Sequence, residues 1–183
     1  INTVDLETPE DTPLLIDGFS IDDIDAALDD PNAEYALNVT VDSGILVLNP
    51  AFVASNNLTV SGNGTDSVEL KGTVGDLNTA IANGLIEFNP DLNFFGDVQV
   101  DVTVDDQGNE GIVISGVDDT LNTNSGSFNI EVTEVNDTPE TTPVTLPDIE
   151  EDSGIFSISE SDLIANATDC LLYTSPSPRD TPI

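Results

Sequence analysis

The residues best suited to chemistry lie in the segment 134–139, whose sequence is Glu-Val-Asn-Asp-Thr-Pro. Glu134, Asn136 and Asp137 place two carboxylates and one amide carbonyl within four residues. Oxygens of these kinds are the ligands of hard cations such as Ca²⁺. Pro139 restricts the residue before it and keeps the segment extended. The pattern predicts a cation site, although a polar turn after a last strand would have the same composition.

Acidic pairs recur elsewhere in the chain, and their positions favour cation binding over a simple polar turn. They lie before the first apolar run, after it, near the middle of the chain and beyond residue 139. The pairs are Glu10 with Asp11, Asp23 with Asp25, Asp105 with Asp106, and Glu151 with Asp152. Because they gather near both ends of a predicted domain, we expect clustered carboxylates rather than isolated ones.

The charge of the chain excludes several classes of function. It carries 36 acidic and 2 basic residues, no His, and a formal charge of −34 over 183 residues. Such a surface repels phosphate backbones and anionic headgroups, so we expect no nucleic-acid partner. Without His there is no Ser-His-Asp or Cys-His pair and no His-ligated metal. The natural partners are cations, and we expect stability to depend on them. No apolar run approaches a bilayer span, so we expect no membrane insertion.

Short strands separated by turn residues make up most of the chain. We expect strands at residues 36–41, 45–48, 58–61, 67–71, 85–88, 97–104, 112–114 and 128–132. The first two are expected to form a hairpin through Asp42-Ser43-Gly44, and alternating Val in 97–104 predicts a half-buried strand. Thr73 begins one short helical segment near 74–82, which ends at Asn83-Gly84. The spacing favours an all-β fold, a β-sandwich of Greek-key type.

The domain organisation follows from the changes in composition. We expect a sandwich repeat at residues 1–139, a Pro/Thr-rich linker at 140–147, and the truncated start of a second repeat at 148–169. Glu151-Asp152-Ser153 matches Glu10-Asp11-Thr12 at a distance of 141 residues, which indicates tandem repeats. Residues 148–169 cannot bury a core alone, and we expect 140–169 to be poorly ordered.

Both ends of the sequence have the features of a fragment. The chain contains no Met, so we expect Ile1 to be an interior residue of a longer protein. Residues 170–180, Cys-Leu-Leu-Tyr-Thr-Ser-Pro-Ser-Pro-Arg-Asp, have the sequence of a translated sequencing adapter. We therefore expect 170–183 to be a disordered artefact that is not part of the fold.

The ordered motifs of residues 8–139 resemble the cadherin-like tandem repeats of large bacterial surface adhesins. These motifs are Glu-Asp-Thr-Pro-Leu, Ser-Ile-Asp-Asp-Ile-Asp-Ala, Gly-Asn-Gly-Thr, Gly-Thr-Val-Gly-Asp-Leu-Asn-Thr-Ala-Ile, Phe-Asn-Pro, Val-Thr-Val-Asp-Asp and Val-Asn-Asp-Thr-Pro. Residues 151–169 resemble the opening of a sister repeat. The resemblance implies a cadherin-like or immunoglobulin-like sandwich, Ca²⁺ at the junctions, neighbouring repeats as partners, and type I secretion to the cell surface.

The resemblance also assigns the acidic residues to two junctions. Glu10 and Asp11 would join Glu134, Asn136 and Asp137 at the junction after this repeat. At the junction before this repeat, the ligands would be Asp23, Asp25 and either Asp105 or Asp106. Asp169, from the next repeat, would join the junction after this one. Glu134 stands where cadherins have Asp and Thr138 where they have Asn, so the number of ions per junction stays open.

Two functions are consistent with these features. The first is a calcium-binding structural repeat that stiffens the stalk of a secreted adhesin for adhesion or biofilm formation, with cell-surface or matrix molecules as further partners. The second is a salt-adapted β-sandwich that binds a carbohydrate or protein ligand, in which case acidic residues could lie anywhere on the surface. No pair of carboxylates is placed across a cleft by the sequence, and we expect no enzymatic activity.

Overall fold

The computed structural model describes residues 1–23, 32–55, 58–108, 123–146, 148, 149, 151, 152 and 154–168. Contacts divide the chain into two units, Ile1–Glu134 and Val135–Ile183, which are described separately. The expected strand at 112–114 and the adapter-like residues 170–183 lie outside the described residues, as do Asp25 and Asp169.

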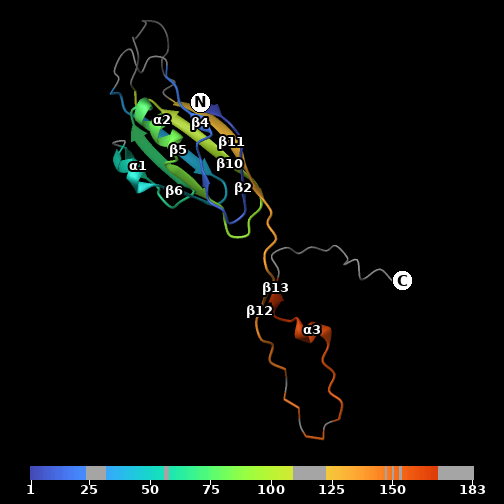
Figure 1. Ribbon diagram of the computed structural model, residues 1–183. Helices are drawn as coiled ribbons and strands as arrows, with labels where there is room; N and C mark the ends of the chain where they lie inside the picture. Colours follow the sequence, from blue (N-terminus) through green and yellow to red (C-terminus); the bar gives the residue numbers. More distant parts are fainter. Residues whose placement is uncertain are drawn as a thin grey trace, which may run out of the picture. The chain divides into compact units, whose positions relative to one another are not determined.

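The first unit is mostly β, which confirms the all-β expectation. Within the described residues, its larger sheet has six strands in the order β2-β11-β10-β5-β8-β7. Figure 1 labels β2, β11, β10 and β5 of this sheet. The bounds of the strands are Leu6–Pro9 for β2, Thr123–Thr133 for β11, Gly96–Asp105 for β10, Tyr35–Val41 for β5, Ser67–Gly72 for β8 and Thr59–Ser61 for β7. All neighbours are antiparallel except β2 and β11, which run parallel.

The alternation of residues in β10 explains why this sheet has one buried face. Val98, Val100 and Val102 are fully buried, whereas the intervening residues point outward. The outward face carries like charges side by side, because Glu131 on β11 lies opposite both Asp97 on β10 and Glu7 on β2.

A second sheet of three strands has the order β3-β9-β6. It consists of Leu14–Leu15 (β3), Ile86–Asn89 (β9) and Ile45–Leu48 (β6). Leu46 and Phe88 from this sheet and Leu37, Val68 and Val100 from the larger sheet belong to one buried cluster. The two sheets therefore share a single hydrophobic core. A further pair of strands, Asn2–Thr3 (β1) and Phe19–Ser20 (β4), pairs antiparallel beside them.

The predicted hairpin between residues 36–41 and 45–48 is wrong. Both segments are strands, but β5 belongs to the six-stranded sheet and β6 pairs with β9 in the other sheet. Residues 42–44 carry the chain from one sheet to the other. Asp42 is held on the larger sheet because its Oδ1 accepts a hydrogen bond from Gln99 N at 3.0 Å. Gly44 follows with φ +78°, a left-handed conformation that suits glycine.

The described part of the first unit also includes two helices. Helix α2, Val74–Ala82, forms where the Thr73 motif predicts it. Thr73 Oγ1 accepts a hydrogen bond from Asp76 N at 3.1 Å, and the helix buries Leu77 and Ile81. Helix α1, Pro50–Ser55, was not predicted, because its Asn-Pro start has the composition of a turn. Asn49 Oδ1 accepts from Ala51 N at 3.1 Å and caps its first turn.

The described residues of the second unit form short elements. Glu140–Thr141 (β12) pairs with Ala167–Thr168 (β13), and Glu160–Leu163 forms helix α3. Ser159 caps α3, and its hydroxyl and backbone N–H both donate to Asp162, which lowers the pKa of that carboxyl from its ordinary 3.8. All described residues of 148–168 are exposed, so this part buries no core. These elements were not predicted. Among the described residues, no helix has the length and apolar character needed to cross a bilayer.

Candidate cation site at the end of strands β2 and β11

The turn after β2 brings Glu10 and Asp11 to the end of the last strand of the unit. Strand β2 pairs with β11 up to Pro9 and Thr133, and Glu10 N extends this ladder by donating to Thr133 O at 2.8 Å. Asp11 then adopts a positive φ of 56°, which turns the chain sharply. This geometry buries Glu10, which is only 5% exposed, and leaves Asp11 exposed.

Hydrogen bonds within the turn fix its shape. Thr8, which is 2% exposed, donates from Oγ1 to Thr12 O at 3.0 Å. The Thr12 hydroxyl in turn donates to Glu10 O at 3.3 Å. Asp11 Oδ1 accepts from Asn93 N at 2.9 Å, which ties the turn to the loop between β9 and β10. The carboxylates of Glu10 and Asp11 therefore belong to a turn whose backbone is fixed by hydrogen bonds.

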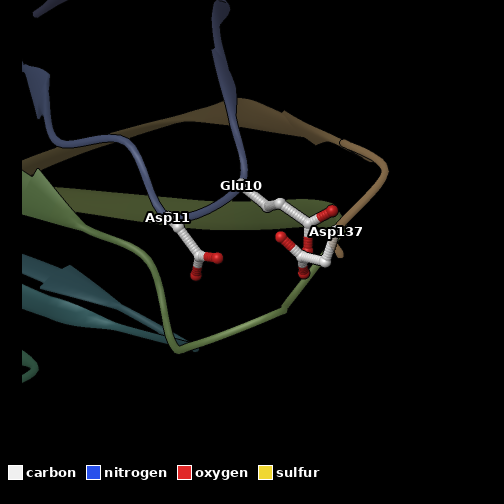
Figure 2. Close-up of side chains that lie close together, drawn as sticks. All are labelled: Glu10, Asp11 and Asp137. Carbon is white, nitrogen blue, oxygen red and sulfur yellow. The ribbon is translucent and has the colours of Figure 1, made fainter. Parts of the chain in front are cut away.

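Three carboxylates gather at this point. One oxygen each of Glu10, Asp11 and Asp137 lies within 4.8 Å of the others, with Asp137 four residues beyond the end of β11 (Figure 2). Oδ2 of Asp137 is shielded from solvent and has no hydrogen-bond partner among the described residues. Buried polar atoms are nearly always satisfied in folded proteins, so this oxygen is a candidate ligand atom for a cation.

The chemistry of this group suits a hard cation. Its donors are carboxylate oxygens, the preferred ligands of Ca²⁺. Like charges so close together repel one another, and one of the three side chains is buried, where solvent screening is weakest. These residues fit a calcium ion on both counts, since a bound cation would cancel the repulsion and satisfy the orphaned oxygen.

The other residues predicted for this junction lie nearby in sequence but outside the group of three. Glu134 is exposed and follows β11 directly. Asn136 is exposed and donates from Nδ2 to the carbonyl of Asp137 at 2.9 Å.

Sequence reasoning missed two further acids at this end of the sheet, Asp42 and Asp91. Asp91 Oδ2 accepts from the Ser43 hydroxyl at 2.9 Å and from Gly44 N at 3.1 Å. Asp42, as noted, accepts from Gln99 N. These carboxylates hold loops in place. The turn sequence Asp42-Ser43-Gly44 is a signal that could have indicated the role of Asp42, whereas no local pattern links Asp91 to Ser43.

The remaining predicted ligands lie at the opposite end of the sheet. Asp105 ends β10 and pairs in register with Ala36 at the start of β5, whereas Gly96 at the other end of β10 pairs with Val132. Ten residues at about 3.3 Å each separate these ends by about 30 Å. Asp23 belongs to the Asp105 end, because its Oδ2 accepts from the hydroxyl of Tyr35 at 2.6 Å.

Asp105 and Asp106 shape the loop that follows β10. Asp105 Oδ1 accepts from Gln107 N at 2.7 Å and Asp106 Oδ1 accepts from Gly108 N at 2.8 Å. No carboxylate group comparable to the Glu10 cluster forms around them within the described residues. The structure thus places those predicted ligands that it describes at two ends of one sheet, and brings three of them together.

A positively charged side chain, that of Lys71, lies on the outward face of the larger sheet. Lys71 is the only Lys or Arg that the described part of the chain contains. Its Nζ lies 2.8 Å from Glu69 Oε1. The hydrogen bond and charge of Glu69, with smaller contributions from Glu34 and Asp105, raise the pKa of Lys71 above 10.5.

Comparison with known proteins adds no relative to this description: no family model, curated protein or solved structure matches the chain.

Proposed function

We propose that residues 1–139 form a cadherin-like repeat of Greek-key topology that binds Ca²⁺ at the end of strands β2 and β11. In this proposal the chain belongs to the stalk of a large adhesin that is secreted to the bacterial cell surface. Neighbouring repeats of the same chain are its partners, and Ca²⁺ makes their junctions stiff. The observation that carries the proposal is the group of Glu10, Asp11 and Asp137, with one buried carboxylate and one orphaned oxygen.

The arrangement of strands supports the sandwich. Two sheets share one core, and β2 at the edge of the larger sheet runs parallel to the last strand, β11. The chain passes between the sheets at residues 42–44 rather than continuing as a hairpin, as expected of Greek-key connections.

A second turn of the same kind supports tandem repetition. Asp152 in Glu151-Asp152-Ser153 has φ 70°, and Asp11 in Glu10-Asp11-Thr12 has φ 56°. A non-glycine residue rarely adopts this conformation. Two matching sequences 141 residues apart with the same rare backbone angle are therefore consistent with two copies of one module.

The mechanism is electrostatic. Without a cation, the carboxylates of Glu10 and Asp11 on the turn repel that of Asp137 in the segment leaving the domain. Bound Ca²⁺ supplies the positive charge that turns this repulsion into a cross-link between turn and segment. Cation binding then restricts the motion of the segment that leads to the next repeat, and the free energy of binding stabilises this restricted state.

Calorimetry of the full chain with CaCl₂ tests the proposal. We expect saturable binding that is lost when Glu10, Asp11 and Asp137 are replaced together by Gln, Asn and Asn. The matched control replaces three acids outside the cluster, Asp17, Asp66 and Asp101, by Asn. Equal binding by both triple variants, or a response to NaCl of equal ionic strength as large as that to CaCl₂, would overturn the proposal.

A further inference from the structure

A polar hollow lies on the outward face of the larger sheet, at the Asp105 end. Its volume is about 250 Å³, and it is lined by side chains of four adjacent strands, β8, β5, β10 and β11, and by Gln107. Ala36 forms its floor, because this short side chain on β5 pairs in register with Lys71 on β8 and Asp105 on β10. Longer side chains on both flanking strands thus enclose a small central one.

The hollow presents donors and acceptors together. Lys71 uses one of its ammonium hydrogens on Glu69 and keeps further donor capacity. Asn38 is oriented by its own contacts, since Oδ1 accepts from the Thr40 hydroxyl at 2.9 Å and Nδ2 lies 3.5 Å from Ser67 Oγ. Glu69 and Asp105 add carboxylate oxygens, and Thr103 adds a hydroxyl.

This lining selects the class of ligand by elimination. An anion would enter against Glu69, Asp105 and the field of a chain whose net charge is −34. A simple cation would be repelled by the charge of Lys71 and could not accept from its remaining N–H groups. An apolar ligand would remove water from the ammonium and carboxylate groups of the lining without offering them hydrogen bonds, which is costly. A ligand with several uncharged hydroxyl groups both donates and accepts, and so matches the whole set.

We propose that this hollow is a binding site for one residue of a neutral saccharide. Its volume is just below the roughly 300–1,000 Å³ of pockets for drug-sized ligands, which suits a single sugar ring. Because the lining is polar and lacks an aromatic platform among its described residues, affinity rests on hydrogen bonds, and the dissociation constant falls in the millimolar range. The site is independent of the calcium proposal, since it lies at the other end of the sheet.

NMR titration of the full chain with glucose, galactose, mannose and N-acetylglucosamine tests this site. Glucuronate and putrescine serve as the anionic and cationic probes. We expect at least one neutral sugar to shift the amide signals of Ala36, Asn38 and Lys71 saturably, with no saturable shift from the charged probes. Saturation by a charged probe alone, or by none of the neutral sugars, would refute the saccharide site.

Two variants show whether binding occurs in the hollow. Ala36→Ile fills the floor and is expected to weaken binding at least tenfold. Ser127→Ile adds the same side chain to the same outward face on β11, outside the hollow, and is expected to bind as the unchanged protein does. Asn38→Ala decides the matter if Ala36→Ile does not fold, and it should also weaken binding. Unchanged affinity in the folded variants of the hollow would exclude this location.

Discussion

Replacing Glu10 by Gln should have opposite effects on stability with and without Ca²⁺. The change keeps the shape of a buried side chain and removes its charge. In metal-free buffer it relieves repulsion from Asp11 and Asp137, so the variant should be more stable than the unchanged protein. With Ca²⁺ it removes a ligand, so the variant should be the less stable of the two.

The distances in the cluster give the size of the metal-free effect. Two unit charges at 4.8 Å, the upper limit for the three ligand atoms, repel by about 3.5 kcal/mol at an effective dielectric constant of about 20, and by about 0.9 kcal/mol in water. Asp11 is exposed, so its repulsion with Glu10 is close to the lower value. The pair of Glu10 with Asp137 lies between the two values. Because side chains relax away from each other, we expect a net stabilisation of about 1–2 kcal/mol. Each kcal/mol raises Tm by roughly 2–8 °C.

The effect with Ca²⁺ follows from linkage. A cation at 100 times its dissociation constant stabilises the folded state by about 2.7 kcal/mol. The unchanged protein should gain this amount and Glu10→Gln only a small part of it, so their order of stability reverses between EGTA and CaCl₂.

Thermal melting by circular dichroism in EGTA and in CaCl₂ measures this reversal. Asp17→Asn, which removes one exposed charge outside the cluster, is the control for overall charge and should gain as much from Ca²⁺ as the unchanged protein. If Glu10→Gln is destabilised in EGTA, or gains as much from Ca²⁺ as the control, then the carboxylates do not act as a cation site.

Three further predictions concern other parts of the chain. Glu131→Lys should stabilise the first unit by about 0.2–1 kcal/mol for each of its two acidic cross-strand neighbours. Urea unfolding measures this gain, and 1 M NaCl should suppress it. A gain that does not depend on salt would contradict an electrostatic origin. Gly44→Ala should lower the free energy of unfolding by at least about 1 kcal/mol more than Gly64→Ala does in the same assay. Both glycines have a positive φ, but only the new methyl group at position 44 meets neighbouring atoms, at 2.6 Å. Equal losses of stability would exclude this steric effect. The cap of α3 should persist above pH 3.8 and be lost as the pH falls through the lowered pKa of Asp162. Ser159→Ala should move the midpoint of the Asp162 titration, measured by NMR, up towards 3.8. An unchanged midpoint would show that the Ser159 hydroxyl does not stabilise the carboxylate.

Much of the fold could be predicted because its signals are local. The alternating Val residues of β10 and the cap at Thr73 each specify an element within a few positions, and both are confirmed. That β5 and β6 belong to different sheets could not be predicted in this way. A Ser-Gly turn between two apolar runs is compatible with a hairpin or with a passage between sheets. The choice is made by distant residues, Gln99 beside Asp42 and Asp91 beside Ser43.

The same distinction applies to the candidate site. Clusters of acids in the sequence indicated Glu10, Asp11 and Asp137, but not that Glu10 would be buried while its neighbour is exposed. That difference arises from the parallel pairing of β2 with β11, a contact between residues more than 120 positions apart. The hollow around Ala36 was not predicted either, because it depends on one small side chain lying between two long ones on other strands.

The parallel pairing of β2 with β11 also determines how this unit would bear a mechanical load. Leu6 begins β2 opposite Ile130, and Thr133 ends β11 opposite Pro9. A pull on the chain before Leu6 and after Thr133 therefore acts in opposite directions along two neighbouring strands. The ladder between them is sheared, so its hydrogen bonds share the force at once instead of opening one after another. Resistance to such a pull is a rate of forced unfolding, and the first barrier would lie in this short ladder rather than in the core.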